Sequence, residues 1–524
     1  FRVGLCYQLT IMGVLLESLT TEILCFFLLL LWLIYWYLTK NYDYWDTRGV
    51  PNIKPQFPYG SMRENMLSKT YLGKAHDNIY KQFPNERFYG VVVFRRPALV
   101  LKDPELIKRI MVKDFNSFVD RPVIMGNPKE YIMLHLLNLV GKDWKDMRTK
   151  LTPTFTSGKM KTMFVLMEKC SEQLRDHLET EVEKGKTIDA KNVLARFTMD
   201  IIASCAFGLD TDSLTDENSE FFRIFGGVAK TSKSRFIRRV FILIFPSVLR
   251  FLRVNLIRAE LRNFVTNIVR TTIDYRIKNN IKRNDFIDLM IGLRKQDDID
   301  SKQNSDVSDG LTIEQMTAQS FVFFIAGFET ASSLMSFCLY ELSCHQQVQE
   351  QLYQAIKDVV DGNGGKVTYQ VLMEIPFLDQ VLNETLRLYG SAHVLSRVCT
   401  QPYRVPDSDL IIEKDVQVII PLFSLHHDPQ YYPDPYAFKP ERFTAEEIKK
   451  RHPYVFMPFG EGPRNCIGMR FGLMQAKVGL ATIIMNFHVD LSPNQEVPIE
   501  IDKRSLALMP ANPVLLNFSK RKIN

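Results

Sequence analysis

The sequence lacks the features that mark several common classes of protein. Its eight cysteines follow no regular spacing, which argues against a disulfide framework and favours a reducing compartment. Its net charge of +7 is small for 524 residues, and no basic run is interleaved with aromatic residues, so nucleic acid is excluded as the main ligand. No Gly-x-Gly-x-x-Gly fingerprint stands in a strand–turn–helix context, so the chain has no nicotinamide site of its own. The mild positive charge suits an acidic protein partner or an anionic membrane surface.

What the chain has in abundance is apolar side chains. Hydrophobic residues make up 46% and aromatic residues 11% of the chain, which is enough for a large core in one large domain or several smaller ones. The unbroken apolar run Ile23–Leu38, extended through Leu19, reaches the roughly 20 residues that span a bilayer. A cleaved signal peptide is the alternative, but the run is long for one and no small-residue cleavage site follows it.

Charges around this run predict its orientation. Acidic residues precede it and basic residues, beginning with Lys40 and Arg48, follow it, so the positive-inside rule places the rest of the chain in the cytosol. We expect an N-terminal extension (residues 1–18), a transmembrane anchor (19–39), a hinge stiffened by prolines (40–60) and one large domain (61–524). Met12 is a candidate start residue, which would make residues 1–11 upstream sequence.

A single cysteine lies in a glycine-rich turn at Phe459–Gly468. A helical pattern follows at once, so the amide donors and dipole of the helix N-terminus, together with Arg464, are expected to favour the thiolate of Cys466. A lone cysteine is more often an inert core residue, but glycines pack poorly in a core. A zinc site would need further thiolates or histidines at short spacing, and none lies nearby. A single axial thiolate on haem iron fits best.

This stretch closely resembles the cysteine loop of the cytochrome P450 family. The pattern Phe-x-x-Gly-x-Arg-x-Cys-x-Gly is filled by Phe459, Gly462, Arg464, Cys466 and Gly468. The resemblance implies a mainly helical fold with a small β region behind the transmembrane helix. It implies haem b bound through Cys466, with Phe459 and Arg464 beside the cofactor.

A long helix is predicted from the capping box Thr312–Gln315 to about His345. Its centre holds Ala326-Gly327-Phe328-Glu329-Thr330, where a mid-helix glycine costs about 1 kcal/mol relative to alanine. Close packing against another helix is one reason for that glycine. The other is the family's oxygen-binding groove, which this pattern resembles. That resemblance implies that Thr330 donates a hydrogen bond to bound dioxygen, that Glu329 relays protons and that Ala326 lies by the cofactor. Val322 and Ile325 would then line the substrate space.

Two further patterns are expected beside the cofactor. Trp144 and Arg148 are four residues apart on a helical face, which by itself fits a packed tryptophan and a solvated arginine equally well. The family resemblance implies that this pair, and Arg397, meet haem propionates. The same resemblance places Ala392, His393 and Leu395 in the substrate pocket, although Tyr389-Gly390-Ser391 stands where the family usually has proline.

A structural triad is implied by two separated motifs. Glu384 and Arg387 are three residues apart on a helix, a spacing that usually means a surface ion pair. Residues Phe438–Phe443 resemble the family element whose arginine, here Arg442, joins them in a buried network. Such a network fixes geometry more than it adds stability.

Local patterns outside these motifs give four expectations. Alternation over Phe88–Leu101 predicts a hairpin, and a further sheet element is expected near residues 505–518. Phe197–Leu214 predicts a core helix that ends at Gly208. Phe221–Leu256 predicts either an amphipathic surface helix pair or, as we favour, a lid that dips into the membrane. Asp297–Asp309 predicts a surface loop.

Together these features predict a microsomal monooxygenase on the cytosolic face of the endoplasmic reticulum. The resemblance, which is strongest to the insect family-six detoxification branch, implies apolar xenobiotic substrates such as plant toxins or insecticides, with dioxygen as the second substrate. It implies NADPH–cytochrome P450 reductase as electron donor, with cytochrome b5 as a second candidate. These partners would dock on a basic patch near Cys466, for which the candidates are Arg470, Lys477, Lys449, Lys450 and Arg451.

Three alternatives remain from the residues alone. One is a biosynthetic hydroxylase of an endogenous steroid, hormone or fatty acid. The others are a haem-thiolate isomerase that needs no reductase and a non-catalytic haem-binding or steroid-binding membrane protein. Neither of these two needs the pair Glu329 and Thr330, so the presence of that pair argues against both.

Overall fold

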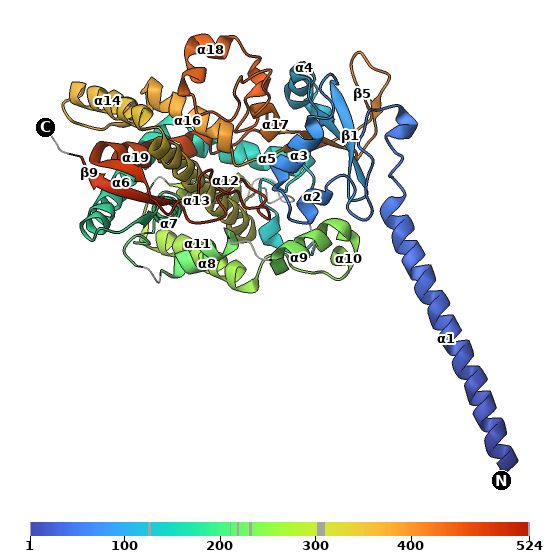
Figure 1. Ribbon diagram of the computed structural model, residues 1–524. Coiled ribbons are helices and arrows are strands. Elements are labelled where there is room, and N and C mark those ends of the chain that lie inside the picture. The colour runs from blue at the N-terminus through green and yellow to red at the C-terminus, as the bar shows by residue number, and fades with distance from the viewer. Residues whose placement is uncertain are drawn as a thin grey trace.

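The fold is a mainly helical body with small sheets and one projecting helix (Figure 1). The computed structural model describes residues 2–123, 127–209, 211–216, 219–229, 233–283, 285–300 and 310–521. The longer helices are α1 (Arg2–Thr39), α3 (Leu72–Tyr80), α5 (Gly141–Leu151), α6 (Ser157–Glu183), α7 (Ala190–Ile202), α8 (Glu220–Ala229), α9 (Lys233–Ile244), α10 (Pro246–Phe251), α11 (Ala259–Asn279), α12 (Phe286–Asp300), α13 (Ile313–Cys344), α14 (Gln346–Gly362), α16 (Pro376–Tyr389) and α19 (Met469–Asn486). This confirms the predicted fold class.

Short helices and strands complete the body. The short helices are α2 (Arg63–Met66), α4 (Pro104–Lys108), α15 (Tyr369–Met373), α17 (Leu422–His426) and α18 (Ala445–Lys449). The strands are β1 (Phe88–Val93), β2 (Arg96–Leu101), β3 (Ile188–Asp189), β4 (Leu395–Val398), β5 (Tyr403–Arg404), β6 (Ile411–Ile412), β7 (Gln417–Ile420), β8 (Phe487–Leu491) and β9 (Leu515–Lys520).

The largest described sheet has the strand order β1-β2-β7-β4. Strands β1 and β2 pair antiparallel from Phe88↔Leu101 to Val93↔Arg96, which confirms the predicted hairpin. Strand β7 pairs parallel with β2 and antiparallel with β4. A second sheet, β3-β9-β8, contains the sheet element expected near residues 505–518, although its strand β9 begins only at Leu515.

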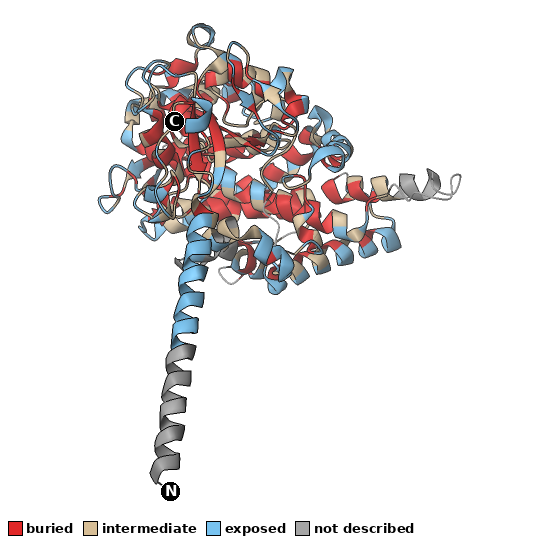
Figure 2. Ribbon diagram, turned by 90° about the vertical axis from the view of Figure 1, so that its right-hand side faces the viewer, coloured by how far each residue is buried: buried red, intermediate tan, exposed pale blue. Residues whose placement is uncertain are grey.

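Helix α1 leaves the body and extends away from it (Figure 1). Nearly all of its described side chains from Thr20 onward are exposed (Figure 2). Two helical stretches are long and apolar enough to cross a membrane, Thr20–Thr39 and α13, but two thirds of the α13 window is buried inside the body. An exposed apolar helix at this position fits the predicted anchor, whereas α13 is a core helix.

Aromatic side chains attach the end of α1 to the body. The Tyr37 ring lies 4.1 Å from the Arg95 guanidinium at the β1–β2 turn and 6.2 Å from the Phe245 ring, between α9 and α10. Farther on, Trp45 is buried and its Nε1 donates to the Val91 carbonyl at 2.9 Å. The first part of the predicted hinge is therefore packed against β1.

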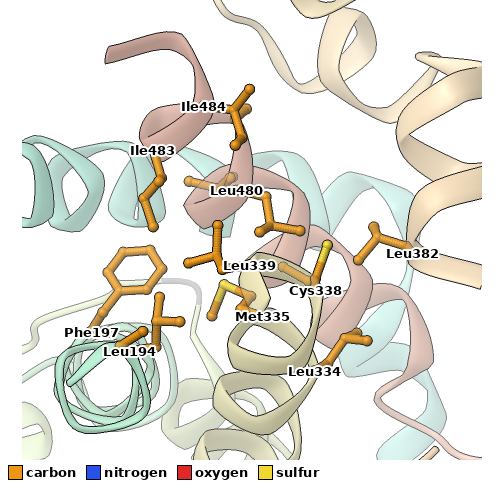
Figure 3. Packing of buried hydrophobic residues seen from close by; sticks show 14 of the residues in the cluster. Leu194, Phe197, Leu334, Met335, Cys338, Leu339, Leu382, Leu480, Ile483 and Ile484 are labelled. Carbon is orange, nitrogen blue, oxygen red and sulfur yellow. The ribbon is translucent and has the colours of Figure 1, made fainter. Parts of the chain in front are cut away.

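Helix α13 forms the centre of the body. Its start is the predicted capping box: the Gln315 amide donates to Thr312 Oγ1 at 3.2 Å, and the Thr312 amide donates to Gln315 Oε1 at 3.0 Å. Its second half packs against α7, α16 and α19, where Met335, Leu339 and Leu480 lie in one continuous apolar cluster (Figure 3). A helix buried along most of its length holds any side chain that faces a cavity in a fixed position.

Two expected boundaries can be compared directly with the structure. The core helix α7 continues into the π-helical turn η6 (Ala203–Phe207) and ends at Gly208, whose φ of +66° is the left-handed conformation that glycine adopts easily. This confirms the predicted end. The loop expected over residues 297–309 is wrong in its first part, because α12 continues through Asp300, and the remaining residues lie outside the described part.

The three residues of the expected triad meet in the buried core. Glu384 accepts from Arg387 through both carboxylate oxygens, at 2.7 and 2.8 Å, and Arg442 Nε lies 3.4 Å from Glu384 Oε1. Arg387 also donates to the carbonyls of His426, Pro435 and Ala437. The ion pair between Glu384 and Arg387 is thus not a surface pair. It fastens α16 to the segment that precedes the cysteine loop.

Candidate active site

A cavity of about 840 Å³ lies at the centre of the body. Its wall brings together α5, α13, the sheet edge at β4 and the cysteine loop, which are far apart in the sequence. Cys466, Thr330, Trp144, Arg148 and Phe459 all contribute to the lining. The remaining lining is mostly apolar, so this space suits an apolar ligand.

Backbone hydrogen bonds fix the cysteine loop. The Cys466 amide donates to the Phe459 carbonyl at 2.8 Å, and the Asn465 amide donates to the Gly462 carbonyl at 3.0 Å. Gly460 and Gly462 have φ of +70° and +72°. A Cβ at Gly462 would lie 2.0 Å from the Met111 carbonyl oxygen, so this glycine is required by both conformation and space.

The surroundings of the Cys466 thiol act on its pKa in two opposite directions. Cys466 faces the cavity and is exposed to it, while the protein packed around the loop partly desolvates the thiol and raises its pKa. The Gly468 amide and the charges of Arg148 and Arg121 act in the opposite direction without outweighing the burial. Arg464, which the sequence placed beside the thiol, instead stacks its guanidinium 4.1 Å from the Trp144 ring.

Four arginines, Arg121, Arg148, Arg397 and Arg464, lie around one side of the cysteine loop. Arg464 is buried and donates to the carbonyls of Val119 and Leu139, but its Nη1 has no partner in the described chain. Arg397 is also buried, and its Nε and Nη2 likewise lack partners among the described residues. Burial and the neighbouring arginine charges, Arg121 foremost, lower the pKa of each to about 9. Such a cluster has room for an added anion.

The residues present fit a planar group that carries carboxylates, as haem does. The unpaired guanidinium N–H groups of Arg397 and Arg464 would donate to the carboxylates. Two glycines on the lining at the start of α19 leave open space: a Cβ at Gly472 would meet no atom within 4 Å, and one at Gly468 would meet nothing closer than Phe155 at 3.9 Å. A flat ring can therefore approach the backbone next to Cys466.

Arg148 has a contact that its spacing did not predict. Its Nη1 donates to the Asn465 carbonyl at 2.8 Å and its Nη2 donates to Asn465 Oδ1 at 2.8 Å. This clamps α5 onto the residue that precedes Cys466. Trp144, one turn earlier, packs under Arg464. Both residues of the expected pair thus lie at the cavity, with the arginine also holding the loop.

The cavity-facing side of α13 is defined by helical periodicity. Val322, Ala326 and Thr330 line the cavity at intervals of four residues, and Thr330 Oγ1 donates to the Ala326 carbonyl at 2.6 Å. Ile325 was expected on this face and is not among the lining residues. It lies about 100° around the helix from Ala326 and packs in an apolar cluster. Phe323, which was not expected, lines the cavity instead.

Gly327 has a packing reason for its presence. A Cβ at this position would lie 2.3 Å from the Cδ1 atom of Ile202 on α7. The glycine therefore lets α7 and α13 approach closely, which confirms close helix packing as one of the two explanations predicted for it. Gly327 also contributes to the cavity lining, so the two explanations are compatible.

Glu329 points away from the cavity lining. Its Oε1 lies 2.7 Å from Lys191 Nζ on α7, and both side chains are about 15% exposed. Lys191 also donates to Ser332 and Ser333. Burial lowers the pKa of Lys191, and the Glu329 carboxylate opposes this effect. Glu329, the acidic residue of the expected pair with Thr330, thus forms an ion pair with a lysine that the sequence analysis did not identify.

The segment after α16 supplies part of the pocket wall. Ala392 and Leu395 line the cavity as expected. His393 was expected there as well and is not among the lining residues. It is buried against α3, with its ring centroid 5.8 Å from that of Tyr71.

Arg121 is a charged cavity residue that sequence reasoning missed, as is Arg96. Arg121 lines the cavity, and its Nη2 donates to the Arg464 carbonyl at 2.9 Å. The only local signal is the following Pro122, which favours an extended backbone at Arg121. That signal says nothing of what the side chain reaches.

The expected basic patch is partly wrong. Lys477 is buried and forms an ion pair with Asp379 at 2.8 Å while donating to the Met373 carbonyl, so it cannot meet a partner protein. The helical pattern of α19 did not show which side packs on α16. Arg470, Lys449 and Lys450 are exposed.

Comparisons with known proteins agree on one family. The family model for cytochrome P450 matches residues 61–518. The Drosophila melanogaster protein named probable cytochrome P450 6a14 is 40% identical over 489 residues, which cover 92% of this chain and 96% of that protein. Probable cytochrome P450 6a13 of the same species is 41% identical over 91% of this chain and 94% of its own length. Cytochrome P450 6k1 of Blattella germanica is 38% identical over 93% and 94%.

Proposed function

Because this chain belongs to the cytochrome P450 family and is a monooxygenase, we propose that it oxidises apolar foreign compounds such as plant toxins or insecticides at the cytosolic face of the endoplasmic reticulum. The observation that carries the proposal is the shared cavity, whose mostly apolar wall holds Cys466 and Thr330 together. The relatives named above are all insect proteins of the same numbered family, which supports a detoxifying role.

The cofactor of this proposal is haem b, whose iron the Cys466 thiolate would hold. When bound, the haem supplies the activation of dioxygen at its iron. Arg397 and Arg464 would pair with its propionates through their unpaired nitrogens, and Trp144 and Arg148 would hold the loop and α5 beside it. Phe459 and Ala326 would border the ring from the loop and from α13.

Thr330 and Glu329 are proposed to handle protons. Thr330 Oγ1 faces the cavity and now donates to the Ala326 carbonyl, so a rotation about its Cα–Cβ bond would deliver its proton into the cavity. Glu329 and Lys191 form a partly exposed pair one residue away, which can take up protons from water outside. In this arrangement Glu329 restores the proton of Thr330 through water.

The cavity wall supports small apolar substrates. Val322, Ala392 and Leu395 contribute apolar surface to the cavity wall, and about 840 Å³ is enough for a drug-sized molecule. The triad of Glu384, Arg387 and Arg442 lies outside the lining, so its proposed role is to hold the core geometry.

Electrons are proposed to come from NADPH–cytochrome P450 reductase, with cytochrome b5 as an additional donor. Arg470, Lys449 and Lys450 are the exposed basic residues that remain for docking after Lys477 is removed from the patch. The anchor at residues 19–39 and the hinge at 40–60 would hold the domain at 61–524 on the membrane.

The first test is the carbon monoxide difference spectrum of dithionite-reduced membranes from wild type and Cys466→Ser. A strongly red-shifted Soret band in wild type, absent from the variant, is expected if Cys466 is the axial thiolate. A folded, haem-loaded wild type without that band would overturn the proposal. Turnover of an apolar substrate with added reductase then separates a monooxygenase from an isomerase, which needs no reductase.

A further inference from the structure

One region of the cavity wall carries polar side chains that the proposed oxidation does not use. It is formed by α2, α3 and two segments joined by the bridge Ala392↔Ala507. Met62, Met66 and Leu72 make this region largely apolar. Asn65 and His76 interrupt it, and their side chains are enclosed, since the two residues are only 5% and 3% exposed.

His76 has no hydrogen-bond partner among the residues that the structure describes. Its Nδ1 is buried without one, and neither ring nitrogen is bonded to another group in the described part of the chain. Burial lowers its pKa to about 4, so the ring is neutral near pH 7 and offers one N–H donor and one acceptor. Enclosed polar groups in folded proteins are nearly always hydrogen-bonded, so a partner from inside the cavity is expected.

The packing behind His76 holds it in place. Gly73 lies one turn before it on α3, and a Cβ there would lie 2.8 Å from His393 Nδ1 and 2.9 Å from Phe423 Cγ. The missing side chain lets His393 pack directly on this face of α3. Burial, together with the nearby His76, lowers the pKa of His393 to about 3, so His393 brings no positive charge to this region.

Asn65 adds an acceptor to the same cavity wall. Its Nδ2 donates to the carbonyls of Thr70 at 3.1 Å and Lys503 at 3.5 Å, so the amide donors are used inside the protein. Its Oδ1 has no hydrogen bond to a described group. The wall therefore offers an acceptor at Asn65 and, at His76, one imidazole nitrogen that is a donor or an acceptor according to the tautomer, since Nδ1 is enclosed. A hydroxyl group, which both donates and accepts, complements the two.

We propose that Asn65 and His76 form a subsite for a neutral hydroxyl group on an otherwise apolar substrate, and that His76 determines specificity for it. The inference rests on the proposed function, because it assumes that the substrate occupies this cavity. The α2–α3 region lies at the side of the body from which α1 departs, and α19 lies at the other side (Figure 1). The hydroxyl end would therefore point toward the anchor, and the carbon to be oxidised would lie near Thr330.

The test is calorimetric titration of the purified, full-length holoprotein in lipid nanodiscs with decane, decanol and decanoate. His76→Leu should weaken decanol binding about tenfold, as expected for one lost hydrogen bond, and change decane binding little. His76→Gln, which keeps a donor and an acceptor, should retain decanol binding. His135→Leu is the matched control, because His135 is also buried with an unpartnered Nδ1 but does not line the cavity.

Equal losses for decane and decanol in His76→Leu would mean that His76 is only a steric wall, and would overturn the subsite. Preference of wild type for decanoate over decanol would also overturn it, since a neutral subsite disfavours a carboxylate. If His76→Leu does not fold, the binding of the same three ligands to His76→Gln and Asn65→Leu tests the subsite instead. Calorimetry does not depend on the oxidation, so an absent thiolate-type spectrum in wild type would count against the proposed function alone.

Discussion

Individual glycines control how closely the cysteine loop can approach its neighbours. Gly462 is the clearest case, because it combines a φ of +72° with the Met111 carbonyl at only 2.0 Å from the position of a Cβ. A backbone carbonyl cannot move aside as the end of a flexible side chain can. The loop that carries Cys466 therefore has one allowed residue at this position.

Gly462→Ala should destabilise the protein by about 2–5 kcal/mol, from left-handed strain plus overpacking. It should also reduce haem incorporation, since the loop must shift. Thermal unfolding and the haem-to-protein ratio check both effects. Gly292→Ala is the control: Gly292 is exposed on α12 with nothing within 4 Å of its Cβ position, so alanine should stabilise by about 0.5–1 kcal/mol. Equal behaviour of the two variants would contradict this account.

For individual residues, the sequence predicted which motif residues line the cavity better than it predicted what each of them contacts. Cys466, Thr330 and Arg148 all lie on the lining. The partner of Glu329 could not be foreseen, because Lys191 is 138 residues away and has no motif of its own. The partner of Lys477 was missed for a related reason: a single helix pattern does not show which neighbouring helix brings an acid such as Asp379.

Helices α7 and α13 can pack closely because Gly327 has no side chain to separate them. Gly327→Ala would place a Cβ 2.3 Å from Ile202 Cδ1, which should cost about 1–3 kcal/mol of overpacking. Ile202→Val removes that carbon and alone should cost about 0.5–1.5 kcal/mol. The double variant should be less destabilised than the sum, by roughly 1 kcal/mol. Additive unfolding free energies in this cycle would show that the contact is not limiting.

Element boundaries followed from the sequence where a local signal was strong. The capping box gave the start of α13, and the alternation of Phe88–Leu101 gave β1 and β2. The signal was weaker after Asp297, where polar composition suggested a loop but α12 continues to Asp300. Helix packing also decided that Ile325 does not line the cavity, because the rotation of α13 about its own axis is set by the neighbouring helices and not by its local sequence.

The whole molecule should lose stability in mild acid because of its buried histidines. Burial lowers the pKa of His76 and His135 to about 4, and of His393, His426 and His427 to about 3. In the unfolded chain each binds a proton near pH 6.5, so the unfolded state takes up more protons below that pH. Stability is therefore complete above about pH 6.5 and falls as the pH falls, by up to about 1.4 kcal/mol per pH unit for each histidine.

Chemical unfolding between about pH 7 and pH 5 checks this expectation, because few carboxylates titrate in that range. His135→Gln should reduce the slope by about one proton, since it removes one such group. An unfolding free energy that is independent of pH in this range would show that these histidines are hydrated in solution.

The body should bind membranes at a second place besides the anchor. Phe251 and Leu252, at the end of α10, are 85% and 60% exposed and lie in the predicted lid. A chain without residues 1–39 should therefore still bind lipid vesicles, and Phe251→Asp with Leu252→Asp should weaken that binding roughly tenfold or more. Val165→Asp, at a similarly exposed valine on α6, should leave it unchanged. Equal sedimentation of all three proteins would contradict a membrane-facing lid.

The contact of Tyr37 with Arg95 has a consequence for how activity depends on lipid. Phe94 and Arg96, on either side of Arg95, both line the cavity, so this part of the cavity lies beside the end of α1. For an anchored enzyme, the concentration that fills such a cavity is the mole fraction of substrate dissolved in the bilayer. An apparent KM calculated from the total substrate concentration then rises in proportion to the amount of added lipid. The preference among substrates then depends on how strongly each compound partitions into the bilayer as much as on how well it fits the cavity.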